Sequence, residues 1–194
     1  MKSVLVPLAK GFEEIELISV VDILRRANVR VVMASLDSHK RVLGAHHIII
    51  EANATLGELD MAEFSAVVLA GGYEGMQNLA KNDLVTSWLQ AFRANNKLLC
   101  AICAAPIVLD KAGVLPREFT CYPGCEAEIN MQDKHKLTQA VVTHDNIITS
   151  TAPATAAVFA LEIVEHLCGK ERTKALYEEL QMPTLKDYLH TAAY

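Results

Sequence analysis

Residues 97–106 read KLLCAICAAP, an apolar run that ends in small residues and a proline. Residues 98–102 within it have the composition of a buried strand. Four further runs rich in Val, Leu and Ile have the same character and span residues 3–8, 29–35, 66–70 and 146–150. The clearest helical patterns separate these runs and span residues 13–27, 83–95, 104–112 and 153–168. Apolar strands that alternate with helices predict an α/β fold with a mainly parallel sheet and helices on both faces.

One feature lies outside this alternation. Residues 41–50 (RVLGAHHIII) resemble a short antiparallel hairpin, which we expect at the edge of the sheet. The chain has no internal repeat and no low-complexity linker. Its 194 residues are enough for one sizeable core, so we expect a single domain over residues 1–194.

The composition narrows the choice of partner and compartment. The net charge is −5, and the Lys and Arg residues are spread in ones and twos, so we expect no nucleic-acid partner. The longest nearly apolar run, residues 98–109, is too short to span a bilayer, and we expect no membrane partner. Five cysteines are an odd number, and the N-terminal residues lack the pattern of a signal peptide. These features predict a cytoplasmic protein in a reducing environment.

Cys100 and Cys103 have the spacing of a redox dithiol or a zinc site. In an extended strand their side chains point to opposite faces, and their Cα atoms stand ~10 Å apart, beyond the ~7 Å limit of a disulfide. A zinc site would add Cys121 and Cys125, but zinc-binding cysteine pairs usually lie on tight polar or Gly-containing turns, unlike LLCAIC. We therefore expect no disulfide and no metal site here, and interpret Cys100 and Cys168 as small buried apolar residues.

Cys103 differs from these cysteines because the strand ends there and a helix follows. Ligands of open parallel sheets bind beyond the carboxyl ends of the strands, where a residue at such a turn projects. A nearby helix N-terminus stabilises a thiolate, and a sharp strand-to-helix turn exposes the nucleophile in elbow motifs. Cys103 is therefore either a nucleophilic or sensing thiol, or a structural residue, and the local sequence leaves both interpretations open.

Glu16 is the candidate partner of this thiol. Glu13 and Glu14 are explained by the helix dipole, which favours carboxylates in the first turn. The apolar stripe of the helix over residues 13–27 instead directs Glu16 inward, near the strand ends. A carboxylate that points inward needs a partner or a raised pKa, and the Cys103 thiol can serve as that partner.

Gly71 and Gly72 lie at the end of another strand. Glycine lets backbone amides approach a ligand closely, so these residues are candidates for an oxyanion site. The surrounding sequence, LAGGYEGMQNL (69–79), lacks the glycine spacing of phosphate-binding loops. We therefore expect no nucleotide site.

GFEEIE (11–16), LAGGYEG (69–75) and AICAAP (101–106), in that order, resemble the ThiJ/PfpI family. The resemblance covers nearly the whole chain and is greatest to the branch of the parkinsonism-associated protein deglycase and its bacterial relatives. It implies a flavodoxin-like three-layer fold, similar to that of class I glutamine amidotransferases, and a homodimer. It implies no metal and no organic cofactor.

The resemblance also implies roles for particular residues. The nucleophile corresponds to Cys103, the neighbouring glutamate to Glu16, and the oxyanion amides to those of Gly72 and Ala104. Further pocket positions correspond to Gly71, Arg26, Tyr122, Pro153 and, through the dimer partner, His46.

Two departures from the family pattern affect the expected chemistry. Many members have a histidine near the cysteine, where this chain has Tyr122, and Ala104 follows Cys103 where the protease branch has a histidine. Peptidase and amidase activities need a base that activates the nucleophile, so this absence argues against them. The family's SRGPGT is STAPAT here (150–155), which removes an arginine able to bind anionic groups.

From these features we expect a cysteine-dependent enzyme that acts on small α-oxoaldehydes, such as methylglyoxal, or on their adducts with protein groups. The Cys103 thiolate would attack the carbonyl carbon, Glu16 would move the proton, and the amides of Gly72 and Ala104 would hold the oxyanion. The alternative is a non-catalytic holdase chaperone in which a Cys103 sulfinate, hydrogen-bonded to Glu16, senses peroxide. Both functions need the same thiol and carboxyl, so the sequence does not separate them.

Overall fold

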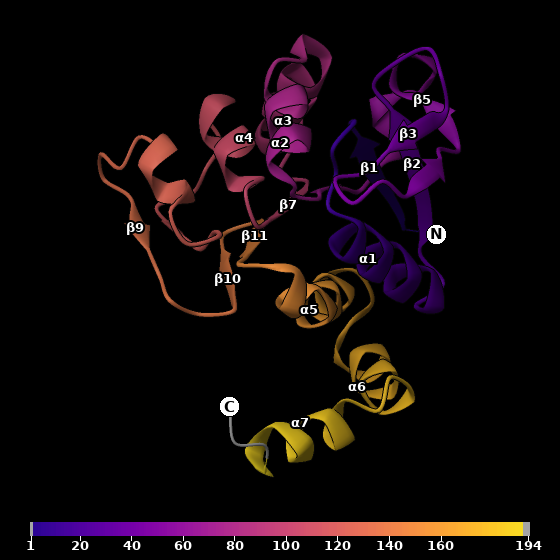
Figure 1. The fold of residues 1–194 in the computed structure, drawn as a ribbon, viewed down its shortest axis with the longest axis vertical. Coiled ribbons are helices and arrows are strands. Elements are labelled where there is room, and N and C mark those ends of the chain that lie inside the picture. Colours follow the sequence, from indigo (N-terminus) through magenta and orange to yellow (C-terminus); the bar gives the residue numbers. More distant parts are fainter. Residues whose placement is uncertain (1, 192–194) are drawn as a thin grey trace.

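A seven-stranded sheet forms the centre of the computed structural model, which describes residues 2–191 (Figure 1). The strand order is β10-β11-β7-β6-β1-β2-β5. The β10–β11 pair is antiparallel and every other neighbouring pair is parallel, which confirms the predicted sheet. The strands are β1 (Ser3–Leu8), β2 (Arg30–Ser35), β5 (Ala54–Thr55), β6 (Ala66–Leu69), β7 (Leu98–Ile102), β10 (Val141–His144) and β11 (Ile147–Ser150).

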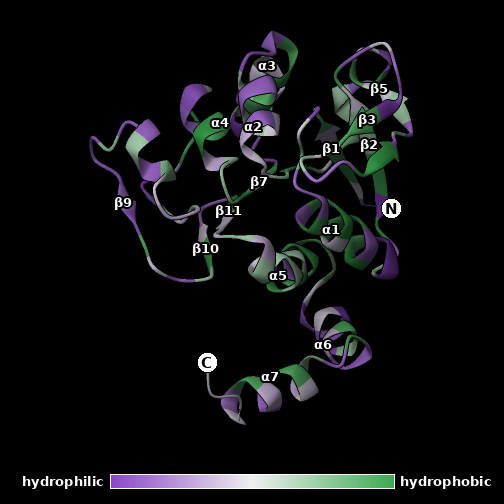
Figure 2. Ribbon diagram, viewed as in Figure 1, coloured by the Kyte–Doolittle hydropathy of each residue, from purple (hydrophilic) through white to green (hydrophobic). Residues whose placement is uncertain are grey.

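Helices cover both faces of this sheet. One face carries α1 (Glu14–Arg26) and α5 (Ala156–Cys168), and the other carries α2 (Tyr73–Ala80), α3 (Asp83–Ala94) and α4 (Pro106–Lys111) (Figure 1). Alternate residues of β1 enter opposite cores, because Val4 and Val6 pack under α1 and α5 whereas Leu5 packs under α3 and α4. In Figure 2 the strand β2 is coloured hydrophobic, as expected for a strand covered on both faces. This arrangement confirms the flavodoxin-like three-layer fold.

The hairpin over residues 41–50 forms, but its predicted place at the sheet edge is wrong. Strands β3 (Arg41–Leu43) and β4 (Ile49–Glu51) make a separate antiparallel sheet, and β5 pairs with β2 at the edge instead. The hairpin hydrogen-bonds to the turn between β1 and α1: Gly11 N–H donates to Leu43 O at 2.8 Å and Ala45 N–H to Phe12 O at 2.9 Å. These bonds fix the hairpin over the start of α1.

Several short elements complete the described chain. The short strands β8 (Glu118–Phe119) and β9 (His135–Lys136) form a separate parallel pair, and α6 (Lys170–Glu179) and α7 (Met182–Thr191) follow α5. Four short 3-10 helices span Leu56–Glu58, Met61–Glu63, Cys125–Glu128 and Pro153–Thr155. Among the helices within residues 2–191, none has the length and apolar content needed to cross a membrane.

Candidate active site

Cys103 occupies the turn directly after β7. Its backbone has φ 64°, in the left-handed region that residues other than glycine rarely adopt. Two hydrogen bonds hold this turn: Cys103 N–H donates to Ser150 O at the end of β11, and Tyr122 N–H donates to Cys103 O, each at 2.9 Å. The helix α4 begins only at Pro106, so the thiol stands on a strained turn before the helix rather than on its first residue.

Glu16 lies in the first turn of α1 with its side chain fully buried. Its Oε2 accepts a hydrogen bond from Gly71 N–H at 2.7 Å, and its carboxyl group also hydrogen-bonds with the Cys103 thiol. Within residues 2–191, Oε1 of Glu16 is buried and has no hydrogen-bond partner. A buried oxygen without a donor is costly as part of a carboxylate, which favours the protonated acid.

The pKa values of the two groups reflect this burial. Burial raises the pKa of Glu16 from 4.5 to about 7, against the opposing effect of its hydrogen bonds to Cys103 and Gly71. Burial also raises the pKa of Cys103, and a negative charge on Glu16 raises it further, while the amides of Gly72 and Ala104 oppose the rise. We expected the helix N-terminus to favour the thiolate, but burial outweighs it. The two groups titrate as a pair, and the thiolate is favoured when Glu16 keeps the proton.

The glycines after β6 give this pair its space. A Cβ atom at Gly71 would stand 2.6 Å from Cys103 Cβ and 2.6 Å from Glu16 Oε2. Gly72 has φ 85°, and a Cβ there would stand 2.8 Å from Glu13 N and collide with Gly11 O. The amide of Gly72, together with that of Ala104, hydrogen-bonds with the Cys103 sulfur. Backbone donors and the carboxyl group therefore converge on one thiol.

We expect Gly71→Ala to displace this group, because the added methyl would overlap both Cys103 and Glu16. Overpacking of a buried site costs about 1–3 kcal/mol, so the variant should unfold at lower temperature and its Cys103 should be alkylated at a changed rate. The matched control is Gly57→Ala, since a Cβ at Gly57 would have no neighbour within 4 Å. Equal stability and equal alkylation rates of the two variants would show that the site has spare room.

The other predicted pocket residues differ in their relation to Cys103. Tyr122 is joined to it by the backbone hydrogen bond described above and has an exposed ring. Pro153 begins the 3-10 helix that follows β11 and is partly exposed. His46 lies between β3 and β4 and contacts Glu13 and Glu14 of its own chain.

Arg26 does not join the site in this chain. It lies in the last turn of α1, ten residues after Glu16, which corresponds to about 15 Å along the helix. Its exposed guanidinium pairs with Asp22 at 2.6 Å instead. Arg26 therefore does not approach Cys103 within the described chain, because one helix carries Arg26 and Glu16 at opposite ends, and its family-based place in the pocket stays a prediction.

Some neighbours of the site were not recognised in the sequence. Tyr73 directly follows Gly72, and its hydroxyl donates to Glu128 Oε1 at 2.8 Å, a contact across 55 residues that no local pattern signals. The expectation for Cys168 was also wrong: it is exposed at the end of α5, whereas Cys100 is buried as predicted. The exposure of Cys168 arises because the chain leaves the core at Gly169 to enter α6.

Comparison with known proteins gives matches along most of the chain. Residues 2–166 match the model of the DJ-1/PfpI family. Protein dj-1beta of Drosophila melanogaster is 37% identical over 180 residues, which are 92% of this chain and 96% of that protein. The glutathione-independent glyoxalase DJR-1.2 of Caenorhabditis elegans is 33% identical over 170 residues, 87% of this chain and 89% of the relative. The structure of oxidized Toxoplasma gondii DJ-1 superposes with a TM-score of 0.88 at 30% identity, covering 93% of this chain and 98% of that one.

Proposed function

Because the chain belongs to the DJ-1/PfpI family, we propose that it is a cysteine-dependent glyoxalase that converts methylglyoxal and similar α-oxoaldehydes into 2-hydroxy acids such as lactate. The observation that carries the proposal is the buried Glu16 carboxyl group, hydrogen-bonded to a thiol that two backbone amides also contact. A relative of similar length named as a glutathione-independent glyoxalase supports it. Adducts of the same aldehydes with protein groups form a second substrate class.

The first chemical step is attack by sulfur on the aldehyde carbon. Glu16 holds the proton while the Cys103 thiolate forms the C–S bond, and the carbonyl oxygen becomes an alkoxide. The amides of Gly72 and Ala104 donate hydrogen bonds to the developing oxyanion, and the proton of Glu16 then passes to it. The product is a hemithioacetal on Cys103, and Glu16 is left as a carboxylate.

The second step moves a proton between two carbons. The Glu16 carboxylate takes the proton from the former aldehyde carbon to give an enediolate, in which the hydroxyl proton on that carbon's oxygen moves to the neighbouring oxygen. Glu16 then returns its proton to the neighbouring carbon. The result is a thioester of the 2-hydroxy acid. Water hydrolyses this thioester and restores the thiol, so that methylglyoxal and one water give one lactate without any net oxidation or reduction. We assign no metal or organic cofactor to this reaction.

The test of the proposal is incubation of the purified protein with methylglyoxal, followed by measurement of lactate. Formation of lactate at many equivalents per chain supports the glyoxalase. Consumption of methylglyoxal without lactate, or with a single equivalent bound per thiol, contradicts it.

A second candidate function is a peroxide sensor that switches a holdase chaperone. Its specific support is the same hydrogen-bonded thiol, because a Cys103 sulfinate would accept a bond from protonated Glu16, and the T. gondii relative is known in an oxidized form. The sensor predicts no turnover of methylglyoxal. It predicts suppression of aggregation of a client protein that increases after peroxide treatment and is lost in Cys103→Ala.

We also propose that the chain acts as a homodimer. The exposed side of α1 and the hairpin β3–β4 carry four large apolar side chains, each about half exposed or more: Ile15, Ile18, Ile48 and Ile49. Contiguous apolar surface of this kind is typical of an interface between subunits. The hairpin is fixed beside the start of α1, so the four residues belong to one region of the surface.

Light scattering should give the mass of two chains for the native protein. The double variant Ile15→Asp, Ile18→Asp should give a lower mass, because charge at the centre of an apolar interface is costly. The matched control is Leu84→Asp on α3, which changes an exposed apolar residue outside this region. A monomeric native protein at micromolar concentration would contradict the proposal.

The proposed compartment is the reducing cytosol. All five cysteines are free thiols in the structure, and three of them are buried. A thiol-dependent enzyme stays reduced where glutathione and thioredoxin keep thiols from pairing.

A further inference from the structure

A hydrogen bond of 2.8 Å joins the Tyr73 hydroxyl to the Glu128 carboxylate across 55 residues of sequence. We propose that this carboxylate, held at the rim of the Cys103 site, makes the site select neutral electrophiles over anionic ones. The inference rests on the proposed function and narrows its substrate class. Neutral α-oxoaldehydes such as methylglyoxal are favoured, and α-oxoaldehydes that carry a carboxylate are disfavoured.

Both partners of this hydrogen bond belong to segments that contact Cys103. Tyr73 is the first residue of α2 and follows Gly72, whose amide hydrogen-bonds with the Cys103 sulfur. Glu128 ends the short 3-10 helix that comes soon after Tyr122, whose N–H donates to Cys103 O. The bond between Tyr73 and Glu128 therefore closes a ring of contacts around the turn that carries the thiol.

The place of α4 puts this bond at the end of the turn from which a substrate approaches. Helix α4 packs against both α2 and the 3-10 helix that ends at Glu128, so it lies between the two (Figure 1). The helices α2 and α4 follow the adjacent parallel strands β6 and β7, so their N-terminal ends lie at the same edge of the sheet. The Tyr73–Glu128 bond therefore passes the N-terminal end of α4, next to Cys103.

Glu128 carries a negative charge that no cation offsets within residues 2–191. Its side chain is exposed, and its carboxylate accepts a hydrogen bond from Tyr73 but pairs with no Lys, Arg or His there. The hydrogen bond to Glu128 and the charge of Glu128 raise the pKa of Tyr73, so the hydroxyl stays protonated and remains the donor. Tyr73 thus acts as a positioning residue for the charge.

Charged groups of the neighbouring segments do not reverse this negative charge. Glu126, on the same 3-10 helix as Glu128, pairs with Lys136 at 2.7 Å, and the pair has no net charge. The stretch STAPAT (150–155) begins with Ser150, whose carbonyl oxygen accepts the hydrogen bond from Cys103 N–H, and it contains no basic residue. No cation from these segments is left to attract an anionic substrate.

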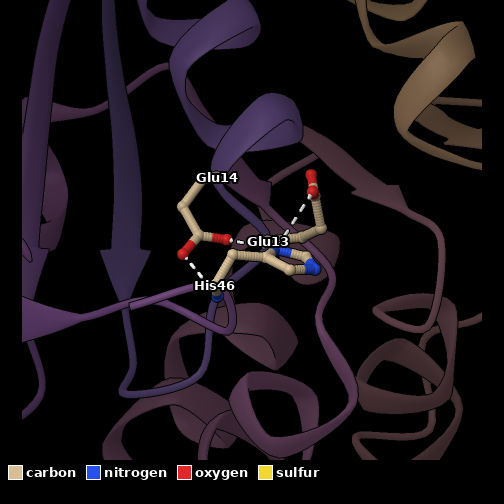
Figure 3. A group of neighbouring side chains, drawn as sticks. All are labelled: Glu13, Glu14 and His46. Carbon is tan, nitrogen blue, oxygen red and sulfur yellow. Dashed lines mark hydrogen bonds and ion pairs between the residues drawn. The ribbon is translucent and has the colours of Figure 1, made fainter. Parts of the chain in front are cut away.

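The carboxylates at the start of α1 also give no excess of positive charge. Figure 3 shows the imidazole of His46 between Glu13 and Glu14, with its Nδ1 3.9 Å from Glu13 Oε1 and 2.9 Å from Glu14 Oε2. Even a protonated imidazole offsets only one of these two charges. Both carboxylates are nearly buried and accept hydrogen bonds from backbone amides, whereas Glu128 is exposed. Glu128 is therefore the charge that a substitution can remove without disturbing buried structure.

The first test compares alkylation of Cys103 by iodoacetamide, which is neutral, with alkylation by iodoacetate, which is an anion. Mass spectrometry of the Cys103 peptide gives both rates. A negative charge about 10 Å from an approaching anion slows it about two- to fourfold at low ionic strength. We therefore expect Glu128→Gln to raise the rate with iodoacetate, relative to that with iodoacetamide, by this factor, and the gain to shrink in about 0.5 M salt.

The matched control is Glu178→Gln on α6, which removes the same charge at an exposed position. Helix α6 contacts the end of α1 remote from Glu16, through the hydrogen bond from Arg172 to Arg26 O. The ratio of the two rates should equal that of the native protein. Circular dichroism checks that each variant is folded.

Tyr73→Phe keeps the charge of Glu128 but removes the hydroxyl that holds it. Its ratio of rates should lie between those of the native protein and Glu128→Gln, and a ratio equal to the native one would show that Tyr73 does not position the charge. Equal ratios in the native protein and Glu128→Gln, the same gain in Glu178→Gln, or a gain that salt does not reduce would overturn the proposal.

Turnover separates this inference from the proposed function. An α-oxoaldehyde with a carboxylate, such as 4,5-dioxopentanoate, should have a lower kcat/KM than methylglyoxal, and Glu128→Gln should narrow the ratio about two- to fourfold. Turnover of both aldehydes with an unchanged ratio contradicts the charge selection alone. No turnover of either aldehyde, with the alkylation rates as expected, contradicts the glyoxalase alone.

Discussion

Cys103→Ser is expected to lower the rate of lactate formation from methylglyoxal by at least about 10³-fold, because a serine hydroxyl stays protonated where the cysteine forms a thiolate. Serine is close to cysteine in size, so the turn between β7 and α4 should keep its hydrogen bonds to Ser150 and Tyr122. The measurement is kcat/KM for lactate production, with circular dichroism as the check on folding.

The control for this variant is Cys168→Ser. Cys168 is exposed at the end of α5, so its replacement removes a thiol without disturbing the core or the site. Its kcat/KM should equal that of the native protein. More than a tenth of native activity in Cys103→Ser would show that another group attacks the substrate, and our assignment of the nucleophile would then be wrong.

Glu16→Gln should reduce turnover about 10²–10⁴-fold, the range expected when a general acid–base residue is removed. The amide has the shape of the carboxyl group and can still donate to the sulfur, so alkylation of Cys103 by iodoacetamide should continue. A fall in turnover with retained alkylation identifies Glu16 as the group that moves the proton. Full turnover in Glu16→Gln would show that the glutamate is structural.

The pH dependence of stability gives an independent check on Glu16. Its pKa is raised by burial from 4.5 to about 7, so folding favours the protonated acid. The stabilisation is complete below the pKa of the unfolded chain and is lost as the pH rises through the pKa of the folded state. Relative to Glu16→Gln, which does not titrate there, the native protein should lose about 3 kcal/mol of unfolding free energy between about pH 4 and about pH 8. If the unfolding free energies of the native protein and Glu16→Gln change with pH in the same way at equal protein concentration, Glu16 is not a buried acid with a raised pKa.

The parts of the fold that could be predicted from the sequence are those with strong apolar periodicity. The central strands are apolar along their whole length because helices cover both of their faces, so β7 and its neighbours were recognisable. Helices α6 and α7 were not, because they contribute few side chains to the core: Leu176 is buried in α6, and no residue is buried in α7. The α6 sequence is mostly polar, and the apolar side chains of α7, such as Leu185 and Leu189, stay largely exposed instead of joining the core.

The candidate site also has parts that could be predicted from the sequence and parts that could not. Cys103 and Gly72 lie at the ends of adjacent strands, and parallel strands bring such ends to one edge of the sheet, so their proximity could be inferred. The pairing of Glu14 with His46 could not, because it depends on where a separate hairpin folds. The pKa of Cys103 also escaped prediction, since burial depends on the packing of side chains from several elements.

The turn that carries Cys103 packs into the cores on both faces of the sheet, which bears on how the candidate site is lost on heating. Cys103 packs in the core under α1 and α5, and Ala104 packs in the core under α3 and α4. The thiol therefore cannot leave its position through the loosening of a surface loop, and the least stable local openings of a protein do not include it. Loss of the Cys103 site on heating should therefore coincide with cooperative unfolding of the whole sheet. A preparation that keeps its native circular dichroism after heating should also keep this site intact.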